Sequence, residues 1–231
     1  AETAMRALIA HERPGDGIRG EEFGVTASQN GYYWVLDPID GTRAYIAGLP
    51  VWTTLIAFCD PHGVPLIGII DQPVLGERYS GWPGQALLQT SGGATHDLSV
   101  SRTEQLNHAI ISTTDPFILT PSEQSAWIDL RHTARLSRYG LDAYAYARLA
   151  AGSIDLVAES GLALHDMAAL LPVIRGAGGV ACDWSGGTAK REGQLVCAAT
   201  PALLEAALIF LKPQAEAASP ISGPLPGTDT E

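Results

Sequence analysis

The sequence has little sulfur and little positive charge. Its 231 residues include 3 cysteines and 2 methionines, and 25 acidic residues against 14 Lys and Arg give a formal net charge of −11. The cysteines, Cys59, Cys182 and Cys197, are far apart, form no C-x-x-C pair and have no His/Cys spacing around them that would suit zinc. Each lies in an apolar context, so we expect buried, reduced thiols.

Other absences narrow the class of protein further. The excess of acid disfavours nucleic acids and anionic membranes as partners. No apolar run is long enough to span a bilayer, and the first five residues look helical rather than like a signal peptide. There is no internal repeat. We therefore expect a cytoplasmic globular protein with one large domain or two small ones.

The run WVLDPIDGT, residues 34–42, holds the most chemistry. Residues 33–36 are aromatic or apolar and predict a buried strand. Pro38 fixes φ and has no N–H, which predicts that a turn begins there, and residues 43–47 predict a short helix. Asp37 and Asp40 would then lie at the carboxyl end of a strand, where open α/β sheets bind ligands.

Two neighbouring carboxylates repel each other unless a cation lies between them or one is protonated. Mg²⁺ prefers oxygen ligands and is the natural counter-charge for Asp37 and Asp40. The N–H groups of Gly41 and Thr42, at the start of the predicted helix, can bind phosphate. The run thus indicates Mg²⁺-assisted phosphoryl chemistry, although an ordinary turn in which Asp37 or Asp40 caps the helix is an alternative.

The rest of the chain predicts alternating helices and strands. Helices are predicted over residues 1–11, 122–135, 143–151, 165–175 and 201–212, and strands over 51–58, 64–70, 77–82, 85–89, 108–113, 154–158, 180–184 and 195–199. The hydroxyl-rich residues 112–116 are interpreted as a turn. Residues 213–231 are rich in Pro, Ser, Gly and Ala and predict a disordered tail.

The run DPIDGT, residues 37–42, resembles the metal-binding signature of the inositol monophosphatase-like family of Mg²⁺-dependent, lithium-sensitive phosphatases. DGTRAYIAGLP, residues 40–50, and GLDAY, residues 140–144, are most similar to the histidinol-phosphatase branch of that family. HDMAA, residues 165–169, resembles the second family signature, with His165 in place of the usual aromatic residue. The imidazole of His165 is either a packing substitute or a substrate contact.

This resemblance covers nearly all of residues 1–212 and implies one phosphatase domain with an α/β fold, a layered αβαβα sandwich, and a homodimeric assembly. In the family a helix and a Thr-x-Ala-Asp segment precede the position of Ala1. The resemblance therefore implies that the amino-terminal helical part is missing, which leaves a third metal position and a closing loop undecided.

The resemblance also assigns roles to residues. The implied metal ligands are Glu21, Asp37, Asp40 and Asp166, with the carbonyl of Ile39. Thr42 and Glu21 would orient the attacking water, and the N–H groups of Gly41 and Thr42 would bind phosphate. Taken alone, Glu21 is more typical of a solvated turn, and Asp142 of a helix N-cap.

The implied reaction is Mg²⁺-dependent hydrolysis of a small phosphomonoester, with L-histidinol phosphate as the first choice and histidine biosynthesis as the setting. Asp142 and Glu159 would face the ammonium group of that substrate, with Arg43 also at the substrate. Inositol monophosphate or a related sugar phosphate is the alternative, followed by a nucleotide bisphosphate. A non-catalytic metal- or phosphate-binding protein is an alternative of another class.

Overall fold

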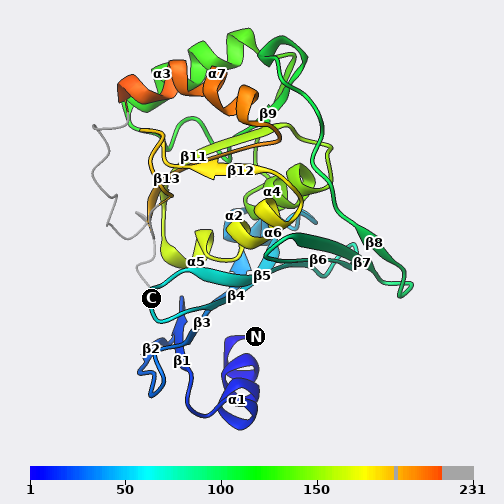
Figure 1. Ribbon diagram of the computed structural model, residues 1–231, viewed down its shortest axis with the longest axis vertical. Coiled ribbons are helices and arrows are strands. Elements are labelled where there is room, and N and C mark those ends of the chain that lie inside the picture. The colour runs from blue at the N-terminus through cyan, green and yellow to red at the C-terminus, as the bar shows by residue number, and fades with distance from the viewer. Residues whose placement is uncertain (190–191, 215–231) are drawn as a thin grey trace.

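Layers of helix and sheet alternate through the molecule (Figure 1). The computed structural model describes residues 1–189 and 192–214. Helices α3 (Pro121–Thr133) and α7 (Pro201–Leu211) cover the outer face of the smaller sheet, and α4 (Ala143–Ala150) and α6 (Leu170–Gly176) lie between the two sheets. Helix α1 (Glu2–Glu12) packs on the other side of the larger sheet. The predicted αβαβα sandwich is confirmed.

The larger sheet has eight strands in the order β2-β1-β3-β4-β5-β6-β7-β8. Its strands are β1 (Gly17–Gly20), β2 (Gly24–Thr26), β3 (Tyr33–Asp40), β4 (Thr53–Cys59), β5 (Pro65–Gln72), β6 (Glu77–Trp82), β7 (Gln85–Thr90) and β8 (Thr95–Asp97). Only the β1–β3 pair is parallel. The consecutive hairpins predicted for residues 51–89 are present, because short turns such as Asp60–Gly63 join alternating apolar strands.

The smaller sheet has five strands in the order β10-β9-β11-β13-β12. They are β9 (Ile110–Ser112), β10 (Leu136–Arg138), β11 (Leu156–Leu162), β12 (Val180–Cys182) and β13 (Gly193–Ala198). Strand β9 is parallel to both β10 and β11, while β13 is antiparallel to β11 and β12. The short 3₁₀ helix Leu106–His108 leads into β9.

Apolar packing is strongest on both faces of the smaller sheet. One cluster fills the space between the sheets and includes Tyr79, Leu149 and Val173; a second, with Trp127 and Trp184, joins the smaller sheet to α3 and α7. The cluster under α1 is much smaller, with Ile9, Ile18 and Leu36 as its buried members. Helix α1 therefore depends more than the others on polar contacts.

Some predicted boundaries are wrong, and two of them concern the acidic motifs. Strand β3 does not stop at Pro38 but continues to Asp40, with a shift in register against β4 between Asp37 and Asp40. Pairing with β1 ends at Leu36, so no hydrogen bond to β1 requires a backbone N–H at Pro38. The helix predicted over residues 165–175 is two helices, α5 (Leu164–Met167) and α6.

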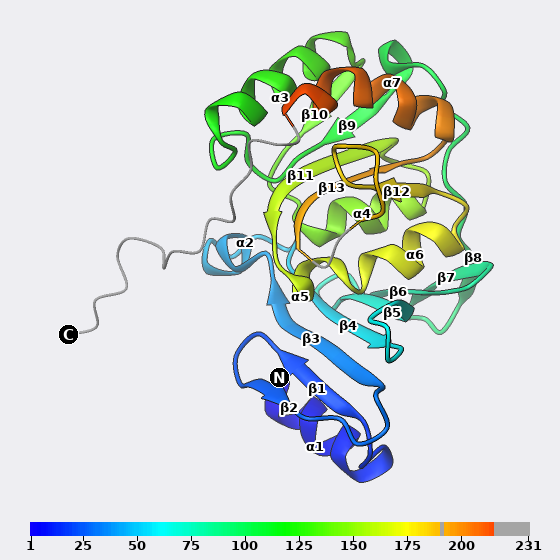
Figure 2. The same cartoon turned by 60° about the vertical axis from the view of Figure 1, so that its left-hand side comes forward.

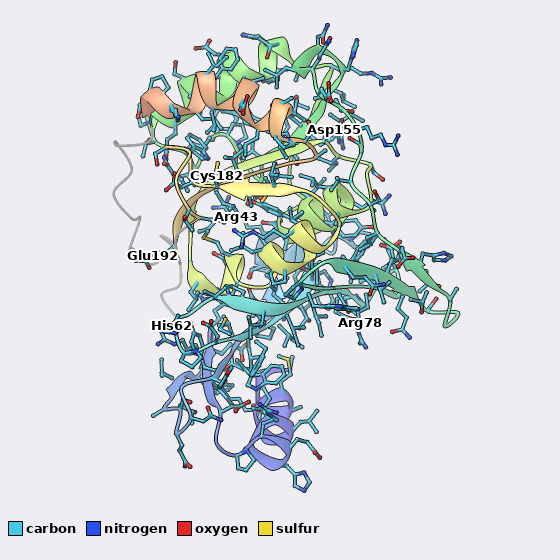
Figure 3. The ribbon with its side chains drawn as sticks, in the orientation of Figure 1. Arg43, His62, Arg78, Asp155, Cys182 and Glu192 are labelled. Carbon is cyan, nitrogen blue, oxygen red and sulfur yellow. The ribbon has the colours of Figure 1, made fainter. Side chains whose placement is uncertain are left out.

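The three cysteines are buried and form no disulfide, as expected. Cys182 lies in the smaller sheet (Figure 3) and Cys59 ends β4 in the larger one. Residues 212–214 form a 3₁₀ turn, and the tail predicted over 213–231 otherwise lies outside the described residues. Of the helices in the described part of the chain, none has the length and apolar character that crossing a membrane requires.

Candidate active site

A cavity of about 290 Å³ is lined by residues from the end of β3, from α2 (Thr42–Ile46), from β11 and from α5. Figure 2 shows these four elements meeting in the fold. Every site residue named from the sequence lines the cavity: Glu21, Asp37, Ile39, Asp40, Gly41, Thr42, Arg43, Asp142, Glu159 and Asp166. These residues come from five separate segments of the chain. The fold therefore brings together side chains as far apart in the sequence as Glu21 and Asp166, which are 145 residues apart.

Three carboxylates in the cavity, those of Asp37, Asp40 and Asp166, share one arrangement. One oxygen of each accepts a backbone N–H, so the other oxygen is the one that would face a ligand; in Asp166 that oxygen lies 3.5 Å from His165 Nε2. The donors are Ile39 at 3.0 Å, Ala143 at 2.8 Å and Ala163 at 2.7 Å, in that order. These bonds fix the orientation of each carboxylate before any ligand binds.

The carboxyl groups in the cavity carry more negative charge than nearby cations offset. Burial, reinforced by the charges of Glu21 and Asp166, raises the pKa of Asp37 to about 8. Burial and then the charge of Asp37 raise the pKa of Asp40 well above its ordinary value, and burial also raises the pKa of Asp166. Of the described residues lining the cavity, Arg43 is the one cation, and it pairs with Asp115 at 3.3 Å.

This set of groups fits a metal ion. Ligand atoms of Asp37, Asp166 and His165 all lie within 4.8 Å of one another. His165 Nε2 is 3.5 Å from the nearer oxygen of Asp166, so the imidazole faces the acid cluster. Oxygen donors with an uncompensated negative charge suit a hard divalent cation, and a bound cation would relieve the repulsion among them.

Gly41 shapes the turn that follows the acidic strand. Its φ of 80° is left-handed, a conformation that L side chains rarely adopt, and it forms the N-cap position of α2. A Cβ there would also come within 3.2 Å of Asp142 Oδ2. The Thr42 hydroxyl donates to the Ile39 carbonyl at 3.2 Å, and the first N–H groups of α2 have no acceptor within the helix.

Asp142 does not act as a helix N-cap by its side chain. It holds the N-cap position of α4, but its carboxylate makes no capping bond there; Asp40 accepts the Ala143 N–H instead. Asp142 is the only residue other than glycine, among those the structure describes, with a positive φ, 46°. Burial raises its pKa, and the charge of Arg43 opposes that rise. Backbone strain of this kind is concentrated at functional sites.

Glu159 closes the inner side of the cavity on β11. It is almost fully buried and accepts hydrogen bonds from the Thr114 and Tyr146 hydroxyls, the latter at 3.1 Å. Burial raises its pKa to about 7, although these hydrogen bonds oppose the shift. Thr113 and Thr114 line the same cavity, so the segment interpreted from sequence as a plain turn belongs to the site. Its hydroxyls at the end of a strand were the only signal.

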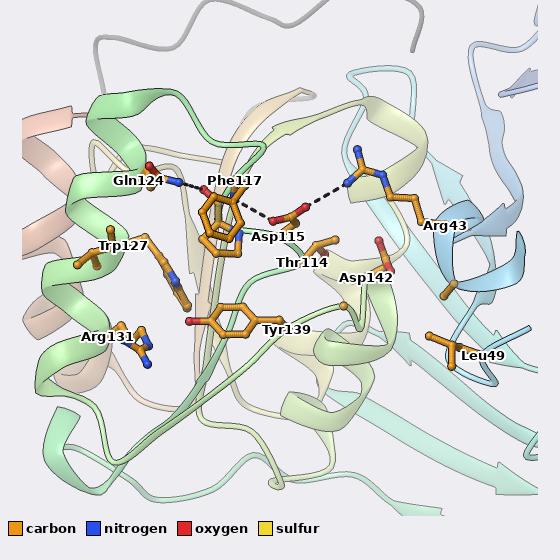
Figure 4. A pocket seen from close by; sticks show the side chains of 14 residues that line it. Arg43, Leu49, Thr114, Asp115, Phe117, Gln124, Trp127, Arg131, Tyr139 and Asp142 are labelled. Carbon is orange, nitrogen blue, oxygen red and sulfur yellow. Dashed lines mark hydrogen bonds and ion pairs between the residues drawn. The ribbon is translucent and has the colours of Figure 1, made fainter. Parts of the chain in front are cut away.

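A second cavity of about 700 Å³ opens beside the first (Figure 4). Arg43, Thr114 and Asp142 line both. The wall toward α3 is aromatic, with Phe117, Trp127 and Tyr139 around it, and the Arg43–Asp115 pair lies at the junction. Arg43 is therefore a boundary residue between an acidic cavity and a more apolar one.

A model of the Inositol monophosphatase family matches residues 1–214. The chain belongs to this family. The chain is 43% identical over 188 residues to the Bifunctional phosphatase IMPL2, chloroplastic, of Arabidopsis thaliana, a match that covers 80% of the chain and 53% of that protein. It is 38% identical over 181 residues to the Histidinol-phosphatase of Mycobacterium tuberculosis, which covers 77% of the chain and 69% of that enzyme. The chain thus spans about half the length of the plant relative.

The fold comparison agrees with the family assignment. The structure of an inositol monophosphatase from Zymomonas mobilis superposes with a TM-score of 0.81 at 36% identity, covering 91% of this chain and 81% of the other. Enzymes of the inositol monophosphatase family are metal-dependent phosphatases, and the oxygen donors in the smaller cavity fit that chemistry. The relatives' names differ in substrate, so membership of the inositol monophosphatase family leaves the substrate to be argued from the cavity.

Proposed function

We propose that the protein is a Mg²⁺-dependent phosphomonoesterase that hydrolyses L-histidinol phosphate to L-histidinol and phosphate in histidine biosynthesis. The observation that carries the proposal is the cavity in which backbone N–H groups fix one oxygen of each of Asp37, Asp40 and Asp166 beside the start of α2. The similarity to the Histidinol-phosphatase of Mycobacterium tuberculosis supports the choice of substrate.

Mg²⁺ would be held by the carboxylates of Glu21, Asp37, Asp40 and Asp166 and by the carbonyl of Ile39. When bound, Mg²⁺ neutralises the phosphate and leaving-group oxygens and lowers the pKa of the attacking water. Because His165 adds an imidazole nitrogen to the oxygen donors, Mn²⁺ is the ion to compare with Mg²⁺ in the same assay.

The chain's own groups orient the reactants. The N–H groups of Gly41 and Thr42 would donate to phosphate oxygens, since the first turn of α2 leaves them without helical acceptors. The Thr42 hydroxyl, already fixed by the Ile39 carbonyl, and the Glu21 carboxylate would hold the attacking water in line with the leaving oxygen. The motifs suggest no side-chain nucleophile, so the water attacks phosphorus directly.

The acidic side of the cavity suits a cationic leaving alcohol. Asp142, at the N-cap of α4, and Glu159, on β11, line the cavity, and both would attract the ammonium group of histidinol. Arg43 lies at the outer side, held by Asp115, where it balances the charge of Asp142. A neutral polyol gains nothing from this arrangement of charge.

The test is phosphate release from L-histidinol phosphate and from inositol 1-phosphate at equal concentration, with Mg²⁺, with Mn²⁺ and with neither. We expect metal-dependent release that is faster from histidinol phosphate, and a loss of that preference in Asp142→Asn. Equal or faster release from inositol phosphate would support the second candidate, inositol monophosphatase, which the similarity to the Zymomonas mobilis structure favours. Metal or phosphate binding without hydrolysis of either ester would indicate a non-catalytic binding protein.

The assembly we propose is a homodimer. Large apolar side chains are exposed, including Phe117, which lines the aromatic cavity from the loop after β9, and Ile46 at the end of α2. Exposed apolar groups of this size are typical of protein interfaces. Light scattering during size-exclusion chromatography decides between one chain and two.

A further inference from the structure

Glu21 lies on a turn that apolar packing hardly supports. The turn joins β1 to β2 and runs through Glu21, Glu22 and Phe23. Phe23 is 61% exposed, and all three residues of the edge strand β2 are exposed. The Glu21 N–H donates to the Leu36 carbonyl at 3.1 Å, which ties the start of the turn to β3. The position of the remaining turn must come from polar contacts.

The carboxylate of Glu2, on α1, supplies those contacts. It is fully buried; one oxygen accepts the Glu22 N–H at 2.9 Å and the other accepts the Phe23 N–H at 3.3 Å. Burial alone would raise the pKa of Glu2, but the hydrogen bonds from Glu22 and Arg6, together with the charge of Arg6, hold it below the ordinary value. Glu2 is therefore an ionised acceptor that holds two consecutive peptide groups.

Arg6 extends the same contact along the strand. Its Nε donates to Glu2 at 2.6 Å, Nη2 to the Gly24 carbonyl at 2.5 Å and Nη1 to the Thr26 hydroxyl at 3.1 Å. We call this pair of side chains, Glu2 and Arg6, the Glu2–Arg6 clamp. The clamp holds both the turn and β2 from one helix.

Gly20 makes room for the clamp. A Cβ at this position would overlap the Glu2 carboxylate, so any larger residue would push Glu2 away from the turn. The glycine that precedes Glu21 in the sequence thus has a packing reason. Helix α1, Gly20 and the turn are thus connected through the Glu2 carboxylate, and the turn carries Glu21.

We propose that Glu2 is a positioning residue that, through the Glu2–Arg6 clamp, holds Glu21 opposite Asp37 across the metal cavity. This rests on the proposed function, in which Glu21 is a metal ligand. If the turn were unsupported, metal binding would have to order it, and the lost conformational entropy would weaken the binding. The clamp orders the turn before the ion binds, so this loss is avoided. Groups that orient metal ligands from behind typically change metal affinity by about 10- to 100-fold when they are lost.

The test measures Mg²⁺ affinity by isothermal titration calorimetry on the full chain. Glu2→Gln keeps the side-chain shape but replaces one acceptor oxygen by an amide that faces backbone N–H groups. We expect its Mg²⁺ dissociation constant to rise about 10- to 100-fold. The matched control is Asp16→Asn: Asp16 is also buried and paired with an arginine, Arg13 at 2.9 Å, but it lies at the other end of β1. The control should keep the wild-type dissociation constant.

A double-mutant cycle with Glu21→Gln separates positioning from general damage. If Glu2 acts through Glu21, then Glu2→Gln weakens Mg²⁺ binding in the wild-type background and changes it less than twofold in the Glu21→Gln background. An unchanged dissociation constant in Glu2→Gln, or an equal loss in both backgrounds, would overturn the inference. If Glu2→Gln does not fold, as judged by circular dichroism, Arg6→Gln replaces it; a wild-type dissociation constant in that variant overturns the inference as well.

Failure of this inference is distinguishable from failure of the proposed function. Wild-type chain that binds Mg²⁺ and hydrolyses a phosphomonoester, beside an unaffected Glu2→Gln, removes only the role of Glu2. Wild-type chain that neither binds Mg²⁺ nor hydrolyses any monoester removes the proposed function itself.

Discussion

Two groups of buried carboxylates in this protein differ in the number of hydrogen-bond donors around them. Outside the cavity, Glu123 is 1% exposed and accepts hydrogen bonds from Thr120, Ser160 and Gln194. Burial alone would raise its pKa, but these donors hold it below the ordinary value. Glu2 and Asp16 show the same balance.

Inside the cavity the balance is reversed. Asp37 accepts one backbone N–H, and burial with the neighbouring acids raises its pKa to about 8. Asp40 accepts two hydrogen bonds, both on the same oxygen. A buried carboxylate that accepts several hydrogen bonds is stabilised in its ionised form and contributes to the stability of the fold. The cavity carboxylates accept fewer hydrogen bonds, and their charge suits a cation from outside the chain.

The largest expected effect comes from Asp40→Asn. The amide oxygen can keep the hydrogen bonds from Ala143 and Thr53, but the ligand oxygen is lost. We expect kcat/KM for the Mg²⁺-dependent reaction to fall by about a thousandfold, which corresponds to several kcal/mol of lost charge stabilisation. The metal-free variant should unfold at a higher denaturant concentration than the wild type, because one repelling charge is gone.

Asp16→Asn is the control for these effects on kcat/KM and on stability. We expect this variant to be less stable than the wild type and to keep wild-type activity. Full Mg²⁺-dependent activity in Asp40→Asn would contradict the division between the two groups of carboxylates.

Removing the metal ion tests the same division without mutation. Mg²⁺ at about 100 times its dissociation constant should raise the free energy of unfolding by about 2.7 kcal/mol over the same protein in EDTA. The measurement is denaturant unfolding under both conditions. Asp37→Asn should lose this gain, since it removes an acid from the centre of the cluster. A gain of equal size in Asp37→Asn would place the ion elsewhere.

Glu123→Gln should show the opposite pattern. Losing charge-assisted hydrogen bonds in a buried site should cost about 1–3 kcal/mol of unfolding free energy, with the Mg²⁺ dissociation constant unchanged. The pKa of Glu123 is lowered in the folded protein, so its contribution is present above the unfolded value near 4.5 and is lost as pH falls through the lower folded value. The difference in unfolding free energy between variant and wild type should therefore shrink below about pH 4.

The smallest effect concerns Glu159 and substrate binding. Because burial raises its pKa to about 7, its negative charge appears only as pH rises through neutrality. The KM for histidinol phosphate should accordingly fall a few-fold between about pH 6 and pH 8, a change of about 1 kcal/mol. Glu159→Gln has no charge to gain and should lack this part of the pH profile. A profile identical in wild type and variant would show that the ammonium group binds elsewhere.

Local patterns in the sequence predicted the parts of the site that lie close together along the chain. The strand, the acidic turn and the short helix of residues 33–47 needed only residue types and spacing, whereas Asp166 came from the resemblance of residues 165–169 to the second family signature. Even here the extent of β3 was missed, because the bulge that accommodates Pro38 depends on where β1 and β4 stop pairing. The end of β3 is therefore set by its pairing with the neighbouring strands and cannot be deduced from residues 33–40 alone.

Contacts between distant segments were beyond the reach of the sequence. The Ala143 N–H binds Asp40 across 103 residues of chain, which removes the capping role that was the alternative interpretation of Asp142. Thr114 binds Glu159 across 45 residues, and Glu2 reaches the Glu21 turn across 20. None of these pairs has a pattern in the sequence, because each depends on how two layers are placed against each other.

The two hydrogen bonds on one oxygen of Asp40 have a consequence for ion selectivity. Thr53 and Ala143 both donate to Oδ2, so Asp40 can offer a cation a single oxygen and cannot rotate to offer two. Asp37 and Asp166 each accept one backbone N–H, which holds one oxygen of each in place but leaves that oxygen a second lone pair. Calcium reaches its larger coordination numbers through carboxylates that bind with both oxygens. Magnesium prefers six ligands and takes one oxygen from each carboxylate. The single oxygen that Asp40 can offer thus suits magnesium better than calcium as the ion of the proposed site.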